Sequence, residues 1–284
     1  MKTHVKQRIV EGIKQARSVF DGNDTEFAVK IGMSAALYSR FKSGEEDIMG
    51  ERMLLGVAEK LYIDISDNEW LIAETKVYKD VCQQLKHCKE HSVSGMLCDL
   101  PDIGKTVAAK DFARKNANVV YVDCGLYKTK QQLIRKIAQD FGAYNKGRYH
   151  DILIGLVSFV KKLHKPLIIL DEAGDLDQNA FLELKALWNA FDGFCGWYRI
   201  GATGLRRKME RGIANETIGY EETYSRFGAR FQRLTPELEK ERQKLIQQAS
   251  LQIIKLNAGG DADVNKILAR SQGSLRRIRI ELTK

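Results

Sequence analysis

Apolar residues recur along this 284-residue chain with two different spacings. From residue 3 to residue 20 they return at about every third or fourth position, which predicts an amphipathic helix. At residues 119–122 and 167–170 they follow one another without a break, and many are β-branched. Such short apolar runs are typical of buried parallel strands. The chain is therefore expected to begin with helices and to continue as an α/β fold.

Two short helices joined by a glycine-containing turn are expected after the first helix. Thr25 would cap a helix over residues 26–31, and Gly32 would end it. Ser34 would then cap a second helix over residues 34–42. A helix, a turn and a second helix in this order form a helix-turn-helix unit.

This unit resembles the lambda-repressor-like helix-turn-helix family, in which the second helix enters the major groove of DNA. The resemblance implies that this helix presents one face to DNA, with Tyr38 and Lys42 as candidate contacts. A helix over residues 54–61 would close the domain. Residues 1–65 hold ten basic and ten acidic side chains, a poor balance for a strong phosphate binder. A role in docking another protein therefore stays open.

A linker and a long helix are expected next. Residues 63–68 are short and polar, which suits a linker. Residues 69–91 predict a helix with Val77, Val81 and Leu85 as its apolar stripe.

The segment that carries the clearest chemistry is CDLPDIGKTVA, at residues 98–108. It predicts the end of a strand, a tight loop and a helix start, where backbone N–H groups and the helix dipole favour a phosphate. In the motif G-x-x-x-x-G-K-[ST] the lysine, here Lys105, reaches the β- and γ-phosphates, and the hydroxyl, here of Thr106, binds Mg²⁺. Asp99 stands where the motif has its first glycine, and its charge is unfavourable near phosphate unless it turns away.

The candidate nucleotide-binding residues are those of the loop and the helix start: Asp102, Ile103, Gly104, Lys105, Thr106 and Val107. A strand, turn and helix without a nucleotide is the alternative. A second motif argues against it, because the apolar run at 167–170 ends in Asp171 and Glu172. Asp171 would hold Mg²⁺, directly or through water, and Glu172 would orient and polarise the attacking water.

The rest of the chain adds three features in a fixed order. Residues 198–202 predict a strand that ends at Thr203. Arg226 and Arg230 precede a short strand predicted at residues 231–234. Helical segments then predict a lid, at residues 237–256 and 261–270 and from the Gly-Ser-Leu-Arg of residues 273–276 onward.

Gly-Lys-Thr, Asp-Glu, a strand-end Thr, an Arg before a strand and a lid with Gly-x-x-Arg together resemble the AAA+ ATPase superfamily. The resemblance covers roughly residues 70–284 and implies an AAA+ P-loop parallel sheet with a helical lid. The domains would be residues 1–65, 66–235 and 236–284. The resemblance also implies roles for single residues: Thr203 as a sensor near the γ-phosphate, Arg226 or else Arg230 as the finger that reaches a neighbouring subunit's nucleotide, and Arg276 or Arg277 as the second sensor.

The charge balance suggests a polyanionic partner. Lys and Arg number 46 against 37 Asp and Glu, which gives a net charge of +9, and the whole surplus lies in residues 66–284. A basic ATPase-like segment suits double-stranded DNA. Candidate contacts are a turn with an aromatic residue and a basic cluster expected in a loop: Tyr127, Lys128, Lys130, Arg206, Arg207 and Lys208. A solvated turn and a solvated face are the alternatives.

The cysteines and the apolar runs suggest where the protein acts. Five cysteines without a C-x-x-C pair argue against a zinc site or a disulfide framework and fit a reducing cytosol. No apolar signal segment follows the basic start, and the longest apolar runs are the length of strands. We therefore expect a cytoplasmic protein with no membrane partner.

With a helix-turn-helix in front and so small a lid, the chain resembles the phage Mu B family of ATP-dependent DNA transposition proteins. This resemblance implies ATP and Mg²⁺ as cofactors, slow DNA-stimulated hydrolysis, and a homo-oligomeric filament or ring on DNA. Such an assembly selects the target and activates a partner transposase. Two alternatives stay open: a nucleotide-switched, sequence-specific regulator without significant hydrolysis, and a branch-migration or helicase-loader motor.

Overall fold

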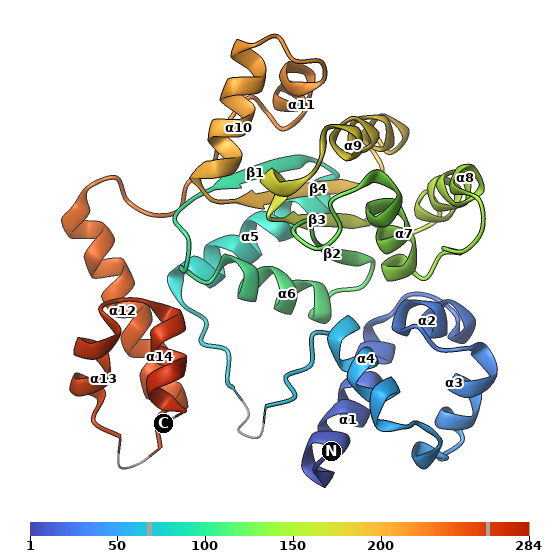
Figure 1. The fold of residues 1–284 in the computed structure, drawn as a ribbon, viewed down its shortest axis with the longest axis horizontal. Helices are drawn as coiled ribbons and strands as arrows, with labels where there is room; N and C mark the ends of the chain where they lie inside the picture. Colours follow the sequence, from blue (N-terminus) through green and yellow to red (C-terminus); the bar gives the residue numbers. More distant parts are fainter. Residues whose placement is uncertain (67–69, 260–261, 284) are drawn as a thin grey trace.

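The computed structural model describes residues 1–66, 70–259 and 262–283. A central sheet has helices on both faces, and the N-terminal and C-terminal helices form two separate groups beside it (Figure 1). Of the expected linker and long helix, residues 67, 68 and 69 lie outside the described residues, as does residue 261 of the expected lid.

The sheet has four parallel strands in the order β1-β4-β3-β2. Their bounds are β1 Ser94–Cys98, β2 Val119–Asp123, β3 Leu167–Asp171 and β4 Gly196–Gly201. Helices cover both faces, so the strand interiors are buried and their sequences are continuously apolar. The strand expected at residues 231–234 is reduced to one parallel bridge, which Gln232 makes with Leu97 of β1.

Two helices pack on one face of the sheet and three on the other. α5 Lys76–His91 and α6 Lys105–Lys115 share a core with Val119, Tyr121 and Ile169. The opposite core contains residues of α7 Lys130–Phe141, α8 Tyr149–Val160 and α9 Gln178–Ala190. α10 Thr203–Ala214 and α11 Tyr220–Arg226 extend this second layer (Figure 1).

The long helix expected from residue 69 begins only at Lys76. Thr75 caps α5 by accepting a hydrogen bond from the backbone N–H of Tyr78. Residues 70–75 are irregular and lead to the helix along the cavity described below.

The N-terminal helices have an apolar core of their own. They are α1 Thr3–Val19, α2 Asp24–Ile31, α3 Ala35–Lys42 and α4 Glu51–Lys60. Gly32 ends α2 with φ 75°, in the left-handed region that glycine reaches without strain, and Ser34 caps α3 as expected. The expected cap at Thr25 is wrong, because Asn23 caps α2 in a reciprocal capping box with Glu26.

The N-terminal helices pack on the edge of the sheet. The Tyr62 hydroxyl donates to the backbone carbonyl of Tyr121 in β2 at 2.9 Å, and the two rings meet edge to face. Lys30 of α2 donates to the carbonyl of Asp140 in α7 at 2.9 Å.

The C-terminal helices form a small lid: α12 Glu239–Asn257, α13 Val264–Ser271 and α14 Leu275–Leu282. Asp263 caps α13, and Ser274 caps α14. Within the described part of the chain, every helix is too short or too polar to cross a membrane.

Candidate nucleotide-binding site

A cavity of about 350 Å³ lies where the carboxyl ends of the strands, the start of α6 and the lid meet. All six expected residues of the loop and helix start line it, together with Asp171 and Glu172. The parallel sheet brings these segments together, because β1 and β3 both end at this edge. Ligands bind at the carboxyl ends of strands in open α/β sheets.

Gly104 and Lys105 form the turn into α6. Gly104 has φ 95°, so a side chain here would strain the backbone. The Lys105 amine is largely buried and donates to the carbonyl oxygens of Asp99, at 3.0 Å, and of Leu100. Burial lowers the pKa of Lys105, and the carboxylates of Asp99 and Asp171 oppose this shift. The amine is thus held within the phosphate loop, where an anion would compensate its burial.

Asp171 is 2% exposed and holds a defined network. Its Oδ2 accepts from the Thr106 hydroxyl at 2.6 Å and from the Tyr121 hydroxyl at 2.8 Å. Its Oδ1 accepts from the backbone N–H of Glu172 at 2.9 Å. The sequence suggested Thr106 and Asp171 separately, and the fold places them in contact. Tyr121 is a third member that the sequence did not suggest.

Glu172 follows β3 directly and lines the cavity. Its φ of 49° lies in the left-handed region, which is uncommon for a residue with a side chain. Burial raises the pKa of Glu172, and the neighbouring charge of Asp171 raises it further. A carboxyl with a raised pKa at the end of a strand, facing a cavity, is suited to act as a base.

The residues present fit a magnesium nucleotide. Within residues 1–66, 70–259 and 262–283, no three His, Cys, Asp or Glu side chains gather as a metal cluster. Mg²⁺ does not need one, because it keeps several waters and takes one or two protein ligands beside phosphate oxygens. The Thr106 hydroxyl and the Asp171 carboxylate, which lie 2.6 Å apart, are such a donor set.

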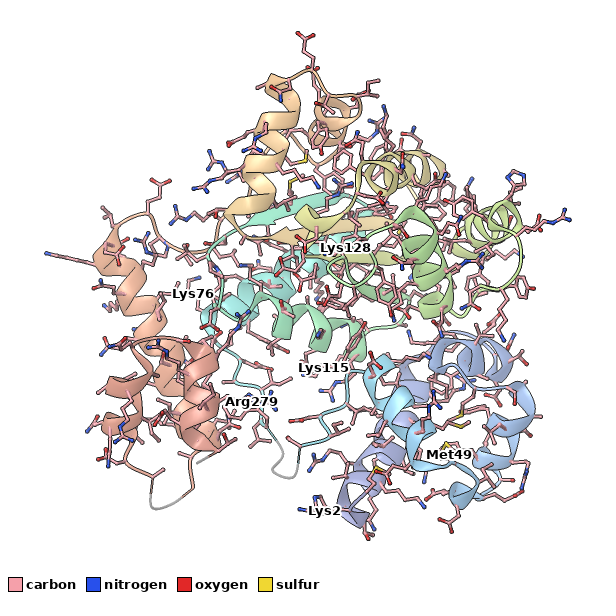
Figure 2. All side chains as sticks on the ribbon, in the orientation of Figure 1. Lys2, Met49, Lys76, Lys115, Lys128 and Arg279 are labelled. Carbon is pink, nitrogen blue, oxygen red and sulfur yellow. The ribbon has the colours of Figure 1, made fainter. Side chains whose placement is uncertain are left out.

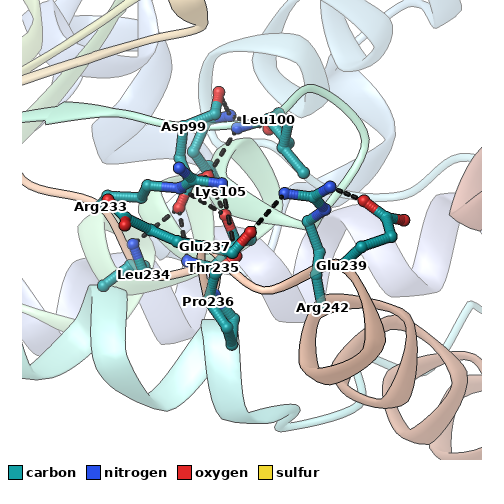
Figure 3. Close-up of polar contacts among 10 residues, drawn as sticks. All are labelled: Asp99, Leu100, Lys105, Arg233, Leu234, Thr235, Pro236, Glu237, Glu239 and Arg242. Atoms are coloured by element: carbon teal, nitrogen blue, oxygen red, sulfur yellow. Dashed lines mark hydrogen bonds and ion pairs between the residues drawn. The ribbon is translucent and has the colours of Figure 1, made fainter.

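Asp99 turns away from the loop interior and is 2% exposed. Its Oδ2 accepts from the backbone N–H groups of Leu234 and Thr235 at 2.7 and 2.8 Å (Figure 3). The charge at the first motif position is therefore compensated by these two donors and by the backbone N–H of Leu100 in the loop, which donates to Oδ1 at 2.7 Å.

The far end of the cavity is apolar and comes from three separated segments. Before α5 lie Trp70 and Ile72, α5 contributes Tyr78, and the lid contributes Ile253. Leu275 of the lid lies beside Gly104 of the phosphate loop instead. None of these residues was expected to contact a ligand. Trp70 and Tyr78 lie in the segment of residues 69–91 that was expected to form one long helix.

The lid brings Arg276 and Arg279 to the cavity, but not Arg277. Figure 2 labels Arg279 on the lid. Its guanidinium lies 5.4 Å from the ring centroid of Trp70. The backbone N–H of Arg276 donates to Oδ1 of Asp102 at 3.2 Å, and Oδ2 of Asp102 accepts from the Ser274 hydroxyl at 2.7 Å. Of the two candidates for a second sensor, Arg276 lies at the site, whereas the Arg277 guanidinium donates to Gln272.

The candidates for the other sensor and the finger lie outside this cavity. Thr203 is exposed at the start of α10, one residue after Ala202, which lines the cavity. Arg226 ends α11, with its guanidinium 5.2 Å from the ring centroid of Trp188. Arg230 is exposed in the following turn. A finger acts on a neighbouring subunit, so this role stays a prediction.

The basic cluster expected in a loop lies on helix α10 instead. Helix formation begins at Thr203, directly after β4. Arg207 is exposed, whereas Arg206 pairs with Glu210 at 2.7 Å. Lys208 donates to the carbonyl oxygens of Gly174 and Leu176, so its amine serves the fold rather than a free surface.

The remaining candidate DNA contacts lie in and after the turn that follows β2. Lys128 and Lys130 are both exposed; Lys128 lies 4.0 Å from Asp175, and Lys130 lies over the ring of Tyr149. Tyr127 packs against the core.

Tyr38 and Lys42 were expected to face DNA from α3. Tyr38 is 3% exposed and meets Phe27 edge to face, so the expected DNA contact of Tyr38 is wrong. Lys42 is exposed and pairs with Asp24 at 2.8 Å.

Known proteins resemble this chain in its central part. Residues 87–209 match the family model of the AAA domain. The Mu-like prophage FluMu DNA transposition protein B of Haemophilus influenzae is 24% identical over 193 residues, a match that covers 66% of each chain. The chain thus spans just under two thirds of that relative.

Solved structures of the RuvB Holliday junction branch migration motor of Thermotoga maritima are also similar. One has a TM-score of 0.40 at 19% identity and covers 71% of this chain and 58% of that chain. A variant of the same motor has a TM-score of 0.38 at 20% identity and covers 73% and 59%.

Proposed function

We propose that this AAA+ chain, which is similar to a Mu-like transposition protein B, is a magnesium-dependent ATPase that assembles on DNA for transposition. The observation that carries the ATPase is the meeting of Lys105, the Thr106–Asp171 pair and Glu172 at one cavity. The relative's name supports transposition as the process. Target selection and activation of a transposase are the roles we infer for the assembly.

The chain's own side chains divide the work of phosphoryl transfer. Lys105 would exchange the loop carbonyls for phosphate oxygens, which compensate its buried charge better. Asp171, held by Thr106 and Tyr121, would present its carboxylate to the metal in a fixed orientation. Bound Mg²⁺ supplies charge neutralisation across the phosphates. Glu172 would orient the attacking water and take its proton.

Assembly follows if the nucleotide lies between two protomers. Arg226 of one protomer would then reach the phosphates bound by the next, because its planar cation pairs well with phosphate oxygens. ATP would favour assembly, since it binds the interface better than the free protomer. The exposed basic residues remain the candidates for contact with the DNA backbone: Lys42, Lys128, Lys130, Arg206 and Arg207.

Electron microscopy of the full chain with duplex DNA and a slowly hydrolysed ATP analogue tests this proposal. We expect an ordered spiral around DNA that is absent without nucleotide. Closed hexamers that translocate would indicate a branch-migration motor instead. Nucleotide-independent binding to one DNA sequence would indicate a regulator.

Calorimetry with the magnesium nucleotide tests the site itself. If the folded protein takes up no nucleotide, even with DNA supplied, the proposed ATPase is wrong.

A further inference from the structure

The carboxylate of Asp99 makes four hydrogen bonds at the motif position where a glycine could make none (Figure 3). One donor is the backbone N–H of Leu100, in the phosphate loop itself, at 2.7 Å. The others belong to a segment more than a hundred residues later: the N–H of Leu234 and both the N–H and the hydroxyl of Thr235. A buried carboxylate with this many donors is held firmly both to the phosphate loop and to the later segment.

The partner segment, residues 233–236, is the hinge between the sheet and the lid. Gln232 still bridges to β1, and α12 begins at Glu239. Pro236 lies at the end of the hinge, and the Arg233 side chain donates to the Thr235 hydroxyl at 3.1 Å. Movement of the lid about this hinge would break charge-assisted hydrogen bonds to Asp99.

The phosphate loop holds the lid at a second point. Asp102 accepts from the Ser274 hydroxyl and from the backbone N–H of Arg276, at the start of α14. These contacts place Arg276 and Leu275 against the cavity. Lys105 also donates to the backbone carbonyl of Asp99. The phosphate-binding lysine and the hinge are therefore both hydrogen-bonded to Asp99.

We propose that Asp99 is a positioning residue, whose carboxylate fixes the hinge to the phosphate loop and thereby sets where the lid meets the nucleotide. The inference rests on the proposed function, because the lid's place matters to catalysis only if the cavity binds a nucleotide. The proposal explains why an aspartate stands where the motif has a glycine. Asp99 makes the phosphate loop less mobile than a glycine would, and in return it fixes the position of the lid.

Asp99→Gly is the decisive variant, since it restores the motif residue. If Asp99 were a mere departure from the motif, this variant would bind ATP as well as the wild type or better. If Asp99 positions the lid, the KM for ATP rises about ten-fold, while kcat at saturation stays within about two-fold because Asp171 and Glu172 are untouched. A protein that was merely less folded would lose kcat instead.

Hydrogen exchange measured on the full chain without nucleotide tests the contact directly. The amides of Leu234 and Thr235 should exchange about ten-fold faster in Asp99→Gly, because they lose their acceptor. Asp99→Asn keeps the shape and one carbonyl oxygen, so its hinge should exchange at an intermediate rate and its KM should be partly restored. Should the glycine variant fail to fold, the same comparison is made between the asparagine variant and the wild type.

Glu239→Gln is the matched control. Glu239 is an exposed carboxylate at the start of α12 that pairs with Arg242, so it shares the region but not the contact. In this variant the rate of amide hydrogen exchange in the hinge and the KM for ATP should equal those of the wild type. Wild-type hinge exchange in the Asp99 variants would overturn the proposal. A wild type that binds no nucleotide would instead overturn the proposed function, and the hinge measurement would still report on Asp99.

Discussion

The two ends of the nucleotide cavity are built in different ways. At the phosphate end, Lys105, Thr106 and Asp171 belong to two short motifs. The Thr106 hydroxyl donates to Asp171 at 2.6 Å, and the Lys105 amine donates to the backbone carbonyl of Asp99 at 3.0 Å. At the opposite end, Trp70 and Ile253 come from segments far apart in the chain and offer apolar surface. Under the proposed function, the phosphate end would carry the chemistry with fixed polar atoms, and the apolar end would select the nucleotide by packing. Substitutions at the two ends should therefore fail in different ways.

The largest effect should come from Glu172→Gln, which leaves the shape of the phosphate end unchanged. We expect kcat to fall about 100-fold to 10,000-fold, because the amide cannot accept a proton from water. Nucleotide affinity should stay near the wild-type value. Phosphate release and calorimetry measure the two quantities, with Glu221→Gln as an exposed control on α11. Unchanged turnover would remove Glu172 from the mechanism.

Lys105→Ala should lower the affinity for the nucleotide more than it lowers kcat. The substitution removes the buried cation of the loop, so affinity for the magnesium nucleotide should fall about 100-fold, or about 2.7 kcal/mol. Titration calorimetry measures the loss. Lys79→Ala, at an exposed position on α5, should bind as the wild type does. An equal loss in both variants would show that general charge, not the loop, binds the nucleotide.

Trp70→Ala tests the apolar end. Loss of the ring removes apolar surface and the ring contact of Arg279, which keeps its ion pair with Asp64, so affinity for ATP should fall about ten-fold. Discrimination among nucleotide bases should weaken, while kcat at saturation should persist. Competition binding with the four nucleoside triphosphates measures this. A variant that lost kcat but kept its affinity would contradict the division between the two ends.

The smallest effect at neutral pH concerns the titration of Glu172. Burial and the charge of Asp171 raise its pKa above the ordinary value of 4.5. A base must be deprotonated, so turnover should decline as the pH falls through this raised pKa, at a higher pH than an ordinary glutamate would give. The pH profile of kcat/KM measures the decline, because this ratio reports the titration of the free enzyme. A profile that stayed flat into the ordinary glutamate range would refute the shift.

The sequence predicted the phosphate end well, because its residues belong to motifs of adjacent positions in the chain. Lys105 follows Gly104 in one turn, and Asp171 ends a run of buried residues, so their neighbours reveal their place. It did not predict Tyr121, Trp70 or Arg279, since each reaches the site only through the packing of distant segments.

The errors have physical causes as well. Tyr38 was assigned to the outer face of α3, but an aromatic cluster with Phe27 and Phe41 draws it into the core. The basic residues of α10 were expected in a loop, but they lie on a helix whose Leu205 and Met209 pack into the core.

Tyr62 protects one edge of the sheet. β2 is one of the two edge strands of the described sheet, and exposed edge strands can pair with other chains. Tyr62 covers a carbonyl of this strand, and α2 packs beside it on α7. The N-terminal helices therefore cover this edge strand and should hinder the addition of a strand from another chain. A chain shortened to begin after residue 66 should scatter more light at equal concentration than the intact protein.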